Sequence, residues 1–359
     1  MNHRVNNFDA LRLLGALLVA FSHTVVVMKG FEPLGDLTQK QSFGGVGLNI
    51  FCIISGFLIT KSGRANNRLA FFEARALRIF PALLVAIPLM ALVFGPMLTS
   101  LTLANYFKTP QLWYFLSSML ALPLNPALPG VVGDAPMIAQ LYSLTAELGF
   151  YLVVGVFASW IHFPKLILCM CGLVFAVFCL NSYDTLPFSR ILSIQVEGMT
   201  LLTFPARLGL TCVYYLLAGS VIALFVSRPQ RLASFVPFLL AGWVYAFTLE
   251  QRHLYDAVEM VLFPPLVIGI AFAKRIRLPV PGAIGDLSYG IYIWHFFIAE
   301  VVLSLLGGRY ANIVIALLLS AATGWLSFRL VEKPALARRR AHARLATGDG
   351  ASVSKAALG

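Results

Sequence analysis

An arginine and a histidine lie eleven positions apart in the first apolar segment, FDALRLLGALLVAFSH, residues 8–23. On an α-helix this spacing gives three full turns plus about 20° and a rise of about 16 Å, so Arg12 and His23 share one face at two depths. A guanidinium binds anions, and a neutral imidazole can take a proton from a hydroxyl. Taken singly, Arg12 is equally well explained as a snorkelling anchor, and His23 as a hydrogen-bonded packing residue.

Two further arginines lie one helical turn apart in KSGRANNRLAFFEARALRIFP, residues 61–81. Arg75 and Arg78 can present two guanidinium forks to one polyphosphate. The other explanation is topology alone, because basic residues collect on the cytoplasmic side of membrane proteins. We prefer topology for Arg64 and Arg68, and we take Arg75 and Arg78 as candidate anion-binding residues.

An acidic residue lies within another apolar segment, QLYSLTAELGFYL, residues 140–152. Glu147 has Ser143 and Tyr151 four positions to either side, and therefore on the same helix face. An intramembrane carboxylate is a candidate functional group because burying its charge is costly. We expect Glu147 at a depth similar to that of His23, where it would orient and polarise the imidazole.

A polar stripe also marks LSYGIYIWHFF, residues 287–297. Ser288, Tyr292 and His295 follow the i, i+4, i+7 spacing of one helix face directed into a bundle. They are candidate supporting or acceptor-site residues, as are Ser143 and Tyr151. A hydrogen-bonded structural network explains the stripe equally well.

The composition indicates an all-α polytopic membrane protein. Of the 359 residues, 59% are hydrophobic and 12% charged, with a mean hydropathy of +0.83, against roughly 45–50% and ~25% in soluble domains.

The five cysteines form no CxxC pair, so no metal site is expected. The net charge of +12 is spread over short loops and a tail without a nucleic-acid-binding motif, so nucleic acid is not an expected partner. No protease, hydrolase or nucleotide-binding motif stands in a plausible context.

About ten segments are long and apolar enough to suggest transmembrane helices in one bundle. They are 8–28, 44–60, 79–98, 139–160, 165–181, 207–226, 232–248, 257–273, 284–306 and 311–330. Cytoplasmic N- and C-termini place 20 of the 27 Lys and Arg residues on the inner side. We therefore predict a membrane domain over 1–334 and a basic, disordered cytoplasmic tail over 335–359. The apolar stretch LWYFLSSMLALPL in the longest outer loop is too short to span, which favours a re-entrant or interfacial helix.

The ordered set of motifs resembles the acyltransferase-3 family of bacterial integral membrane acyltransferases. FDALRLLGALLVAFSH, GGVGLNIFCIISGFLIT, FFEARALRIFP, LYSLTAELGFYL and LSYGIYIWHFF carry this resemblance over about residues 8–334. Arg12 and His23 match the family's Arg-x10-His motif, Arg75 and Arg78 its RxxR motif, and Glu147 its acidic residue. Tyr142 stands where the family often has Trp. The chain resembles the stand-alone form, without an appended esterase-like domain.

The resemblance implies an enzyme of the bacterial cytoplasmic (inner) membrane. It would move an acyl group, most often acetyl, from cytosolic acyl-CoA, a co-substrate rather than a permanent cofactor, to a hydroxyl of a cell-surface or exported glycan or a lipid-linked oligosaccharide. Arg12, Arg75 and Arg78 would hold the CoA phosphates, and His23 would act as general base or as transient acyl carrier. Membrane lipid and polysaccharide-assembly proteins would be its partners. Two alternatives stay open from the residues alone, a transporter or flippase of a polysaccharide precursor and a non-catalytic scaffold.

Overall fold

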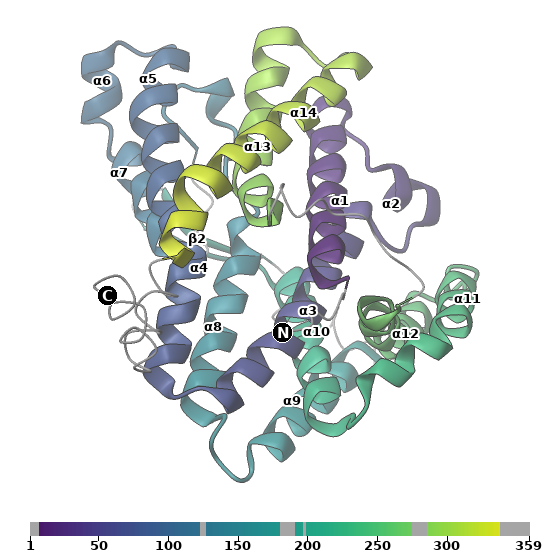
Figure 1. The fold of residues 1–359 in the computed structure, drawn as a ribbon. Coiled ribbons are helices and arrows are strands. Elements are labelled where there is room, and N and C mark those ends of the chain that lie inside the picture. Colours follow the sequence, from purple (N-terminus) through teal and green to yellow (C-terminus); the bar gives the residue numbers. More distant parts are fainter. Residues whose placement is uncertain (1–6, 123–126, 180–190, 197–198, 275–285, 338–359) are drawn as a thin grey trace, which may run out of the picture.

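The computed structural model describes residues 7–122, 127–179, 191–196, 199–274 and 286–337. Helices dominate and pack side by side in one bundle, with α14 (Tyr310–Ser327) crossing one face (Figure 1). Helix α3 (Phe43–Ala65) packs between α1 (Phe8–Lys29) and α10 (Ala206–Phe225). The prediction of a helical, polytopic membrane protein is confirmed. The predicted tail lies outside the described residues from 338 onward.

Seven helical segments among the described residues are long and apolar enough to span a membrane. They are α1 (Phe8–Lys29), α3 (Phe43–Ala65), α4 (Arg68–Leu89) continued by η1 (Met90–Phe94) and α5 (Gly95–Leu98), α10 (Ala206–Phe225), α12 (Arg252–Phe272), α13 (Ser288–Leu306), and α14 (Tyr310–Ser327) continued by η6 (Phe328–Glu332). The apolar helices α8 (Leu141–Phe157) and α9 (Phe163–Cys179) are shorter. The predicted segment 232–248 is divided between η5 (Pro229–Phe235) and α11 (Val236–Ala246). A total of about ten spans therefore stays a prediction.

Short helices fill the described connections. They are α2 (Pro33–Thr38), α6 (Leu103–Lys108), α7 (Pro110–Leu116), η2 (Ser117–Leu120) and η3 (Val132–Asp134). The stretch predicted as a short helix that does not span falls on α7 and η2, which together cover eleven residues.

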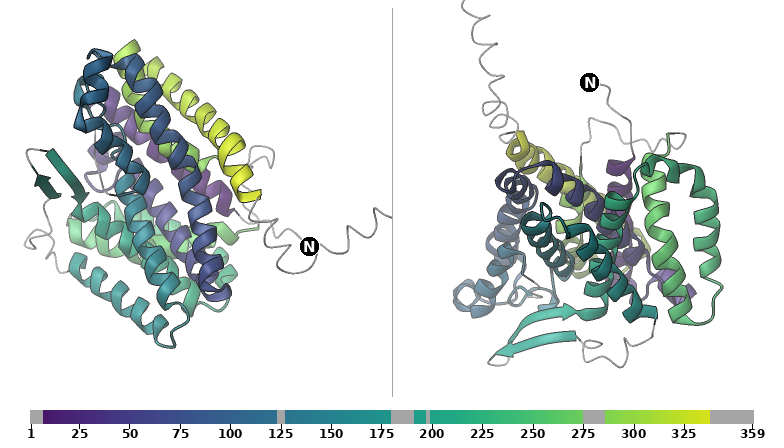
Figure 2. Two further views of the ribbon diagram at one scale, coloured as in Figure 1. Left: turned by 90° about the vertical axis from the view of Figure 1, so that its left-hand side faces the viewer. Right: turned by 90° about the horizontal axis from the view of Figure 1, so that it is seen from below.

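One β-hairpin accompanies the helices, which otherwise make up the described elements. Strands β1 (Ile191–Val196) and β2 (Met199–Pro205) pair antiparallel, with Ile191 opposite Pro205 and Val196 opposite Met199. The hairpin projects from the helical bundle (Figure 2). Its sequence is rich in isoleucine, valine and threonine, whose branched Cβ atoms favour strands over helices.

Side-chain caps define where several helices begin. Ser42 accepts a hydrogen bond from the Gly45 amide at the start of α3, and Asn67 accepts one from the Ala70 amide at the start of α4. Each cap satisfies an amide that has no partner within the helix and stabilises it by about 1 kcal/mol. Helix α1 ends at Gly30, whose φ of 74° is readily adopted only by glycine.

Small residues of α3 let its neighbours approach closely. A Cβ on Gly47 would lie 2.4 Å from the carbonyl oxygen of Gly15 in α1. A Cβ on Gly56 would lie 1.9 Å from the carbonyl oxygen of Leu216 in α10. Such contacts are possible only without a side chain, so α3 packs backbone to backbone against α1 on one side and α10 on the other.

Candidate functional site

A cavity of about 450 Å³ lies between α1, α3, α4, α8 and α13. Its wall combines apolar side chains with a concentration of charged and hydroxyl groups. Eight of the ten candidate site residues line it, namely Arg12, Arg75, Arg78, Ser143, Glu147, Tyr151, Ser288 and Tyr292. Residues from four separate helices that are far apart in the sequence are thus brought to one site.

Asp286, which the sequence analysis missed, links two of the arginines. Its Oδ2 forms an ion pair with Arg78 and lies 3.9 Å from Arg12 Nη1. Its Oδ1 accepts a hydrogen bond from Ser288 Oγ at 2.5 Å, just before α13 begins. Burial alone would raise the pKa of Asp286, but the charges of Arg78 and Arg12 and the hydrogen bonds lower it to about 2. Asp286 is therefore a carboxylate at neutral pH and holds the two guanidinium groups together.

Arg75 makes a different set of contacts. Its guanidinium lies 5.9 Å from the ring of Phe71 and 5.7 Å from that of Tyr151, distances typical of cation–π contacts. Its buried Nε has no hydrogen-bond acceptor within the described part of the chain. Leaving a buried donor unsatisfied costs about 1–3 kcal/mol. An anion bound in the cavity would supply the missing acceptor.

Glu147 belongs to the same cavity as the arginines. Its Oε1 accepts a hydrogen bond from Tyr151 Oη at 2.8 Å, one helical turn along α8. We expected this carboxylate to orient His23. No hydrogen bond between Glu147 and His23 occurs among the described residues, so this part of the prediction is wrong in the structure. The helix pattern placed Glu147 correctly on a polar face of α8 but carried no information on which neighbouring helix that face meets.

The hydrogen-bond partner of His23 is instead His295. His23 Nδ1 lies 2.8 Å from His295 Nε2, across the contact between α1 and α13. His295 is fully buried, whereas His23 is half-buried. Neither histidine lines the arginine cavity. The sequence placed both residues on polar faces but did not predict that they form a pair.

Tyr292 lies between the cavity and the histidine pair. Its hydroxyl is hydrogen-bonded to Ser143 Oγ and donates to the carbonyl oxygen of Gln140 at 2.5 Å. The Gln140 amide returns a bond of 3.0 Å to the carbonyl oxygen of Ile293. The ring of Tyr292 lines the cavity, and its centroid is 6.0 Å from that of His295. These bonds fix the start of α8 against the second turn of α13.

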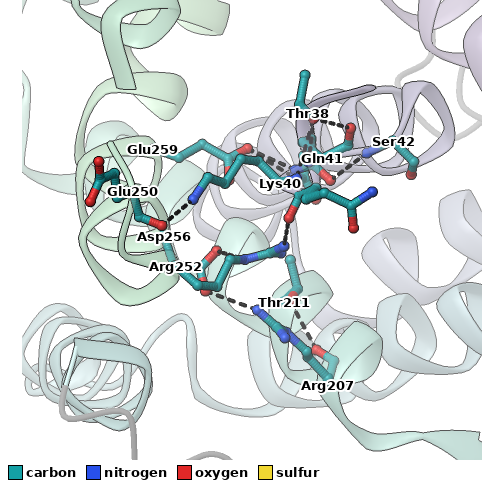
Figure 3. Close-up of polar contacts among 12 residues, drawn as sticks. Thr38, Lys40, Gln41, Ser42, Arg207, Thr211, Glu250, Arg252, Asp256 and Glu259 are labelled. Atoms are coloured by element: carbon teal, nitrogen blue, oxygen red, sulfur yellow. Dashed lines mark hydrogen bonds and ion pairs between the residues drawn. The ribbon is translucent and has the colours of Figure 1, made fainter. Parts of the chain in front are cut away.

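A second polar cluster ties the segment between α1 and α3 to α12. It lies near the start of α3. Arg252 bonds Asp256 at 3.0 Å and the carbonyl oxygen of Gln39 at 3.0 Å, and Arg207 of α10 reaches the same aspartate at 2.9 Å (Figure 3). Beside it, Gln41 Nε2 donates to Glu259 Oε1 at 2.9 Å. These contacts hold the chain that leads into α3.

Comparisons with known proteins identify the family of this chain. Nodulation protein 10 of Rhizobium leguminosarum bv. viciae is 30% identical over 363 residues, which cover 94% of this chain and 94% of that protein. An O-acetyl transferase of Shigella phage Sf6 is 28% identical, covering 94% and 97%. Exopolysaccharide production protein ExoZ of Rhizobium meliloti is 28% identical, covering 84% and 92%. No solved structure matches. The family model described as an acyltransferase domain matches residues 5–331, and the chain therefore belongs to the acyltransferase-3 family.

Proposed function

We propose that this acyltransferase moves an acetyl group from acetyl-CoA to a hydroxyl group of a cell-surface or exported glycan. The observation that carries the proposal is a cavity that gathers Arg12 of α1 with Arg75 and Arg78 of α4. The buried Nε of Arg75 has no acceptor in the described part of the chain. Helix α1 also presents His23, about 16 Å beyond Arg12. Two relatives support the choice of substrates, since one is named an O-acetyl transferase and another an exopolysaccharide production protein.

Arg12, Arg75 and Arg78 would bind the phosphates of the donor. Guanidinium groups form paired, charge-assisted hydrogen bonds with phosphate oxygens, and the partly apolar wall suits the thin arm that carries the thioester. Glu147 and Tyr151 would contact the donor from the same cavity wall as the arginines. Because Tyr292 lines the cavity and its ring lies beside that of His295, the arm would extend past this side chain toward the histidine pair.

His23 would be the general base. It would take the proton of the acceptor hydroxyl while the hydroxyl oxygen attacks the thioester carbonyl carbon. Collapse of the tetrahedral intermediate would break the carbon–sulfur bond and release the CoA thiolate, which would take up the proton held by His23. The products are the acetyl ester of the glycan and CoA, and His23 is regenerated.

We also propose that the protein crosses the bacterial inner membrane about ten times with both termini in the cytoplasm. In this orientation Arg12, Arg75 and Arg78 lie toward the side that holds cytosolic acyl-CoA. His23 lies farther into the membrane, where it is reached from the other side by an exported acceptor.

The proposal is tested by purifying the protein in lipid nanodiscs and measuring release of CoA from labelled acetyl-CoA in the presence of total cell polysaccharide from a deletion strain. We expect wild-type protein to label the polysaccharide and His23→Ala to lose this activity while inserting normally. Arg75→Ala should raise KM for acetyl-CoA about 10-fold or more, because a hydrogen bond to a charged group contributes about 1.5–3 kcal/mol.

Arg68→Ala is the matched control, since Arg68 is an exposed residue of the same helix α4. It should leave KM unchanged. Retained labelling in His23→Ala would refute the assignment of the base. Movement of a glycan across the bilayer without acetyl transfer would show a carrier instead.

A further inference from the structure

The two histidine rings are joined by a hydrogen bond in the plane of the rings. Their planes differ by 17° and their centroids are 5.1 Å apart, while His23 Nδ1 and His295 Nε2 are 2.8 Å apart. The centroid separation exceeds the nitrogen–nitrogen distance by about the sum of the two ring radii. The two nitrogens therefore point directly at each other, and the rings do not stack face to face.

The second nitrogen of His295 determines which atom donates. His295 Nδ1 lies 2.9 Å from the carbonyl oxygen of Tyr292 and 3.1 Å from that of Ile291. A carbonyl oxygen only accepts, so Nδ1 of His295 must carry the hydrogen. In a neutral ring the other nitrogen, Nε2, then has a lone pair and accepts. The hydrogen between the rings therefore belongs to Nδ1 of His23.

These two hydrogen bonds, donated by Nδ1 of His295 and Nδ1 of His23, leave one ring nitrogen of the pair free to take up a proton. With its hydrogen on Nδ1, a neutral His23 has its free lone pair on Nε2. Taking up a proton at Nε2 makes both nitrogens of His23 donors, which the bond to His295 already accommodates without any change of ring orientation. The edge of Phe296 packs against His23, with ring centroids 5.4 Å apart, and limits rotation of the ring.

The start of α3 lies beside Nε2 of the half-buried His23. A Cβ on Gly44, in the first turn of α3, would lie 3.9 Å from His23 Nε2 and 2.9 Å from Ser22 Oγ. Glycine thus lets the start of α3 approach Ser22 closely, and at 3.9 Å even an added Cβ would only touch Nε2.

We propose that His295 is a positioning residue that holds His23 in the tautomer with hydrogen on Nδ1, so that Nε2 faces the acceptor hydroxyl. The proposal rests on the proposed function of His23. It also assigns to His295 the orienting role that we had expected of Glu147.

The kinetic test compares His295→Gln with His295→Leu in the nanodisc assay. A glutamine side-chain oxygen can accept the hydrogen from His23 Nδ1, whereas leucine fills similar space without an acceptor. We expect His295→Leu to lower kcat about 100-fold or more, the range lost with general base catalysis, and His295→Gln to restore at least a tenfold part of that loss. KM for acetyl-CoA should stay within about twofold of wild type in both variants, because the arginine cavity is separate. Equal losses in the two variants, or a parallel rise in KM, would overturn the proposal in favour of a packing role.

A spectroscopic test separates this proposal from the proposed function. Solid-state NMR of protein labelled with ¹⁵N-histidine in bilayers at pH 8 distinguishes protonated from unprotonated ring nitrogens, and the His23 signals are assigned by their absence in His23→Phe. We expect a protonated Nδ1 and an unprotonated Nε2 for His23 in wild-type protein, and loss of this preference in His295→Leu. An unprotonated Nδ1 of His23 in the wild type would refute the tautomer whether or not the protein transfers acetyl groups.

Discussion

Replacing Asp286 by asparagine tests the ion pairs that this residue makes with two arginines of the cavity. The carboxylate is 18% exposed, contacts Arg78 and Arg12, and has a pKa lowered from 3.8 to about 2. A change of one pKa unit corresponds to about 1.36 kcal/mol, so the folded state gains roughly 2 kcal/mol from the ionised form. Asp286→Asn keeps the shape of the side chain and removes this charge, and it leaves the guanidinium groups of Arg12 and Arg78 without the carboxylate that they share.

We therefore expect Asp286→Asn to lower the free energy of unfolding by about 2 kcal/mol at pH 7, and Tm by a few degrees. Because the folded-state pKa lies below the ordinary value of 3.8, the contribution of the carboxylate is complete above about pH 4 and is lost as the pH falls toward 2. The difference between wild type and variant should narrow over this interval.

Thermal unfolding in detergent, followed by intrinsic fluorescence at pH 7 and at pH 3, measures the effect. The matched control is Glu73→Gln, which removes one exposed carboxylate from α4. If Asp286→Asn melts at the same temperature as the control at pH 7, Asp286 does not stabilise the fold through its ion pairs. A difference that is the same at both pH values would show a steric effect of the amide.

Two further substitutions test the contacts within α8 and between α3 and α10. Glu147→Gln and Tyr151→Phe should lower activity non-additively, because the two side chains share a hydrogen bond of 2.8 Å. A double-mutant cycle in the acetylation assay measures the coupling energy between them. Additive effects would show that this hydrogen bond does not contribute to activity. Gly56→Ala should destabilise the protein by about 1–3 kcal/mol, because its Cβ would meet the Leu216 carbonyl oxygen at 1.9 Å. Gly172→Ala in α9, with no atom within 4 Å of its Cβ, should not destabilise it in the same melting experiment.

Features that depend on one helix at a time are predictable from the sequence. The apolar runs locate the long helices, and helix geometry places Arg12 and His23 on one stripe and Arg75 beside Arg78. The structure brings three of these four residues to one cavity. Local periodicity is enough here, because each of these relations lies within a single element.

Features that depend on two helices are not predictable from one sequence. The bond between His23 and His295 joins residues 272 positions apart, and it exists only for one rotation of α1 against α13. The carboxylate of Glu147 satisfied every sequence criterion for the partner of His23, yet α8 turns this face toward the arginines. Asp286 was missed because it lies at the edge of an apolar segment, where an acidic residue is ordinarily a sign of a helix start.

The two ends of the site are built by the same pair of helices. Arg12 of α1 meets Asp286, just before α13, and His23 of α1 meets His295 of α13. Both contacts run in the same chain direction, so α1 and α13 are parallel where they pack. Arg12 and His23 are eleven positions apart on α1, which is about 16 Å along the helix. Their partners Asp286 and His295 are nine positions apart, and Asp286 lies just before α13 begins. The ion pair and the histidine pair thus hold α1 and α13 in one register. A slip of one turn along either helix would separate both pairs at once, so the anion site and the base cannot be displaced independently.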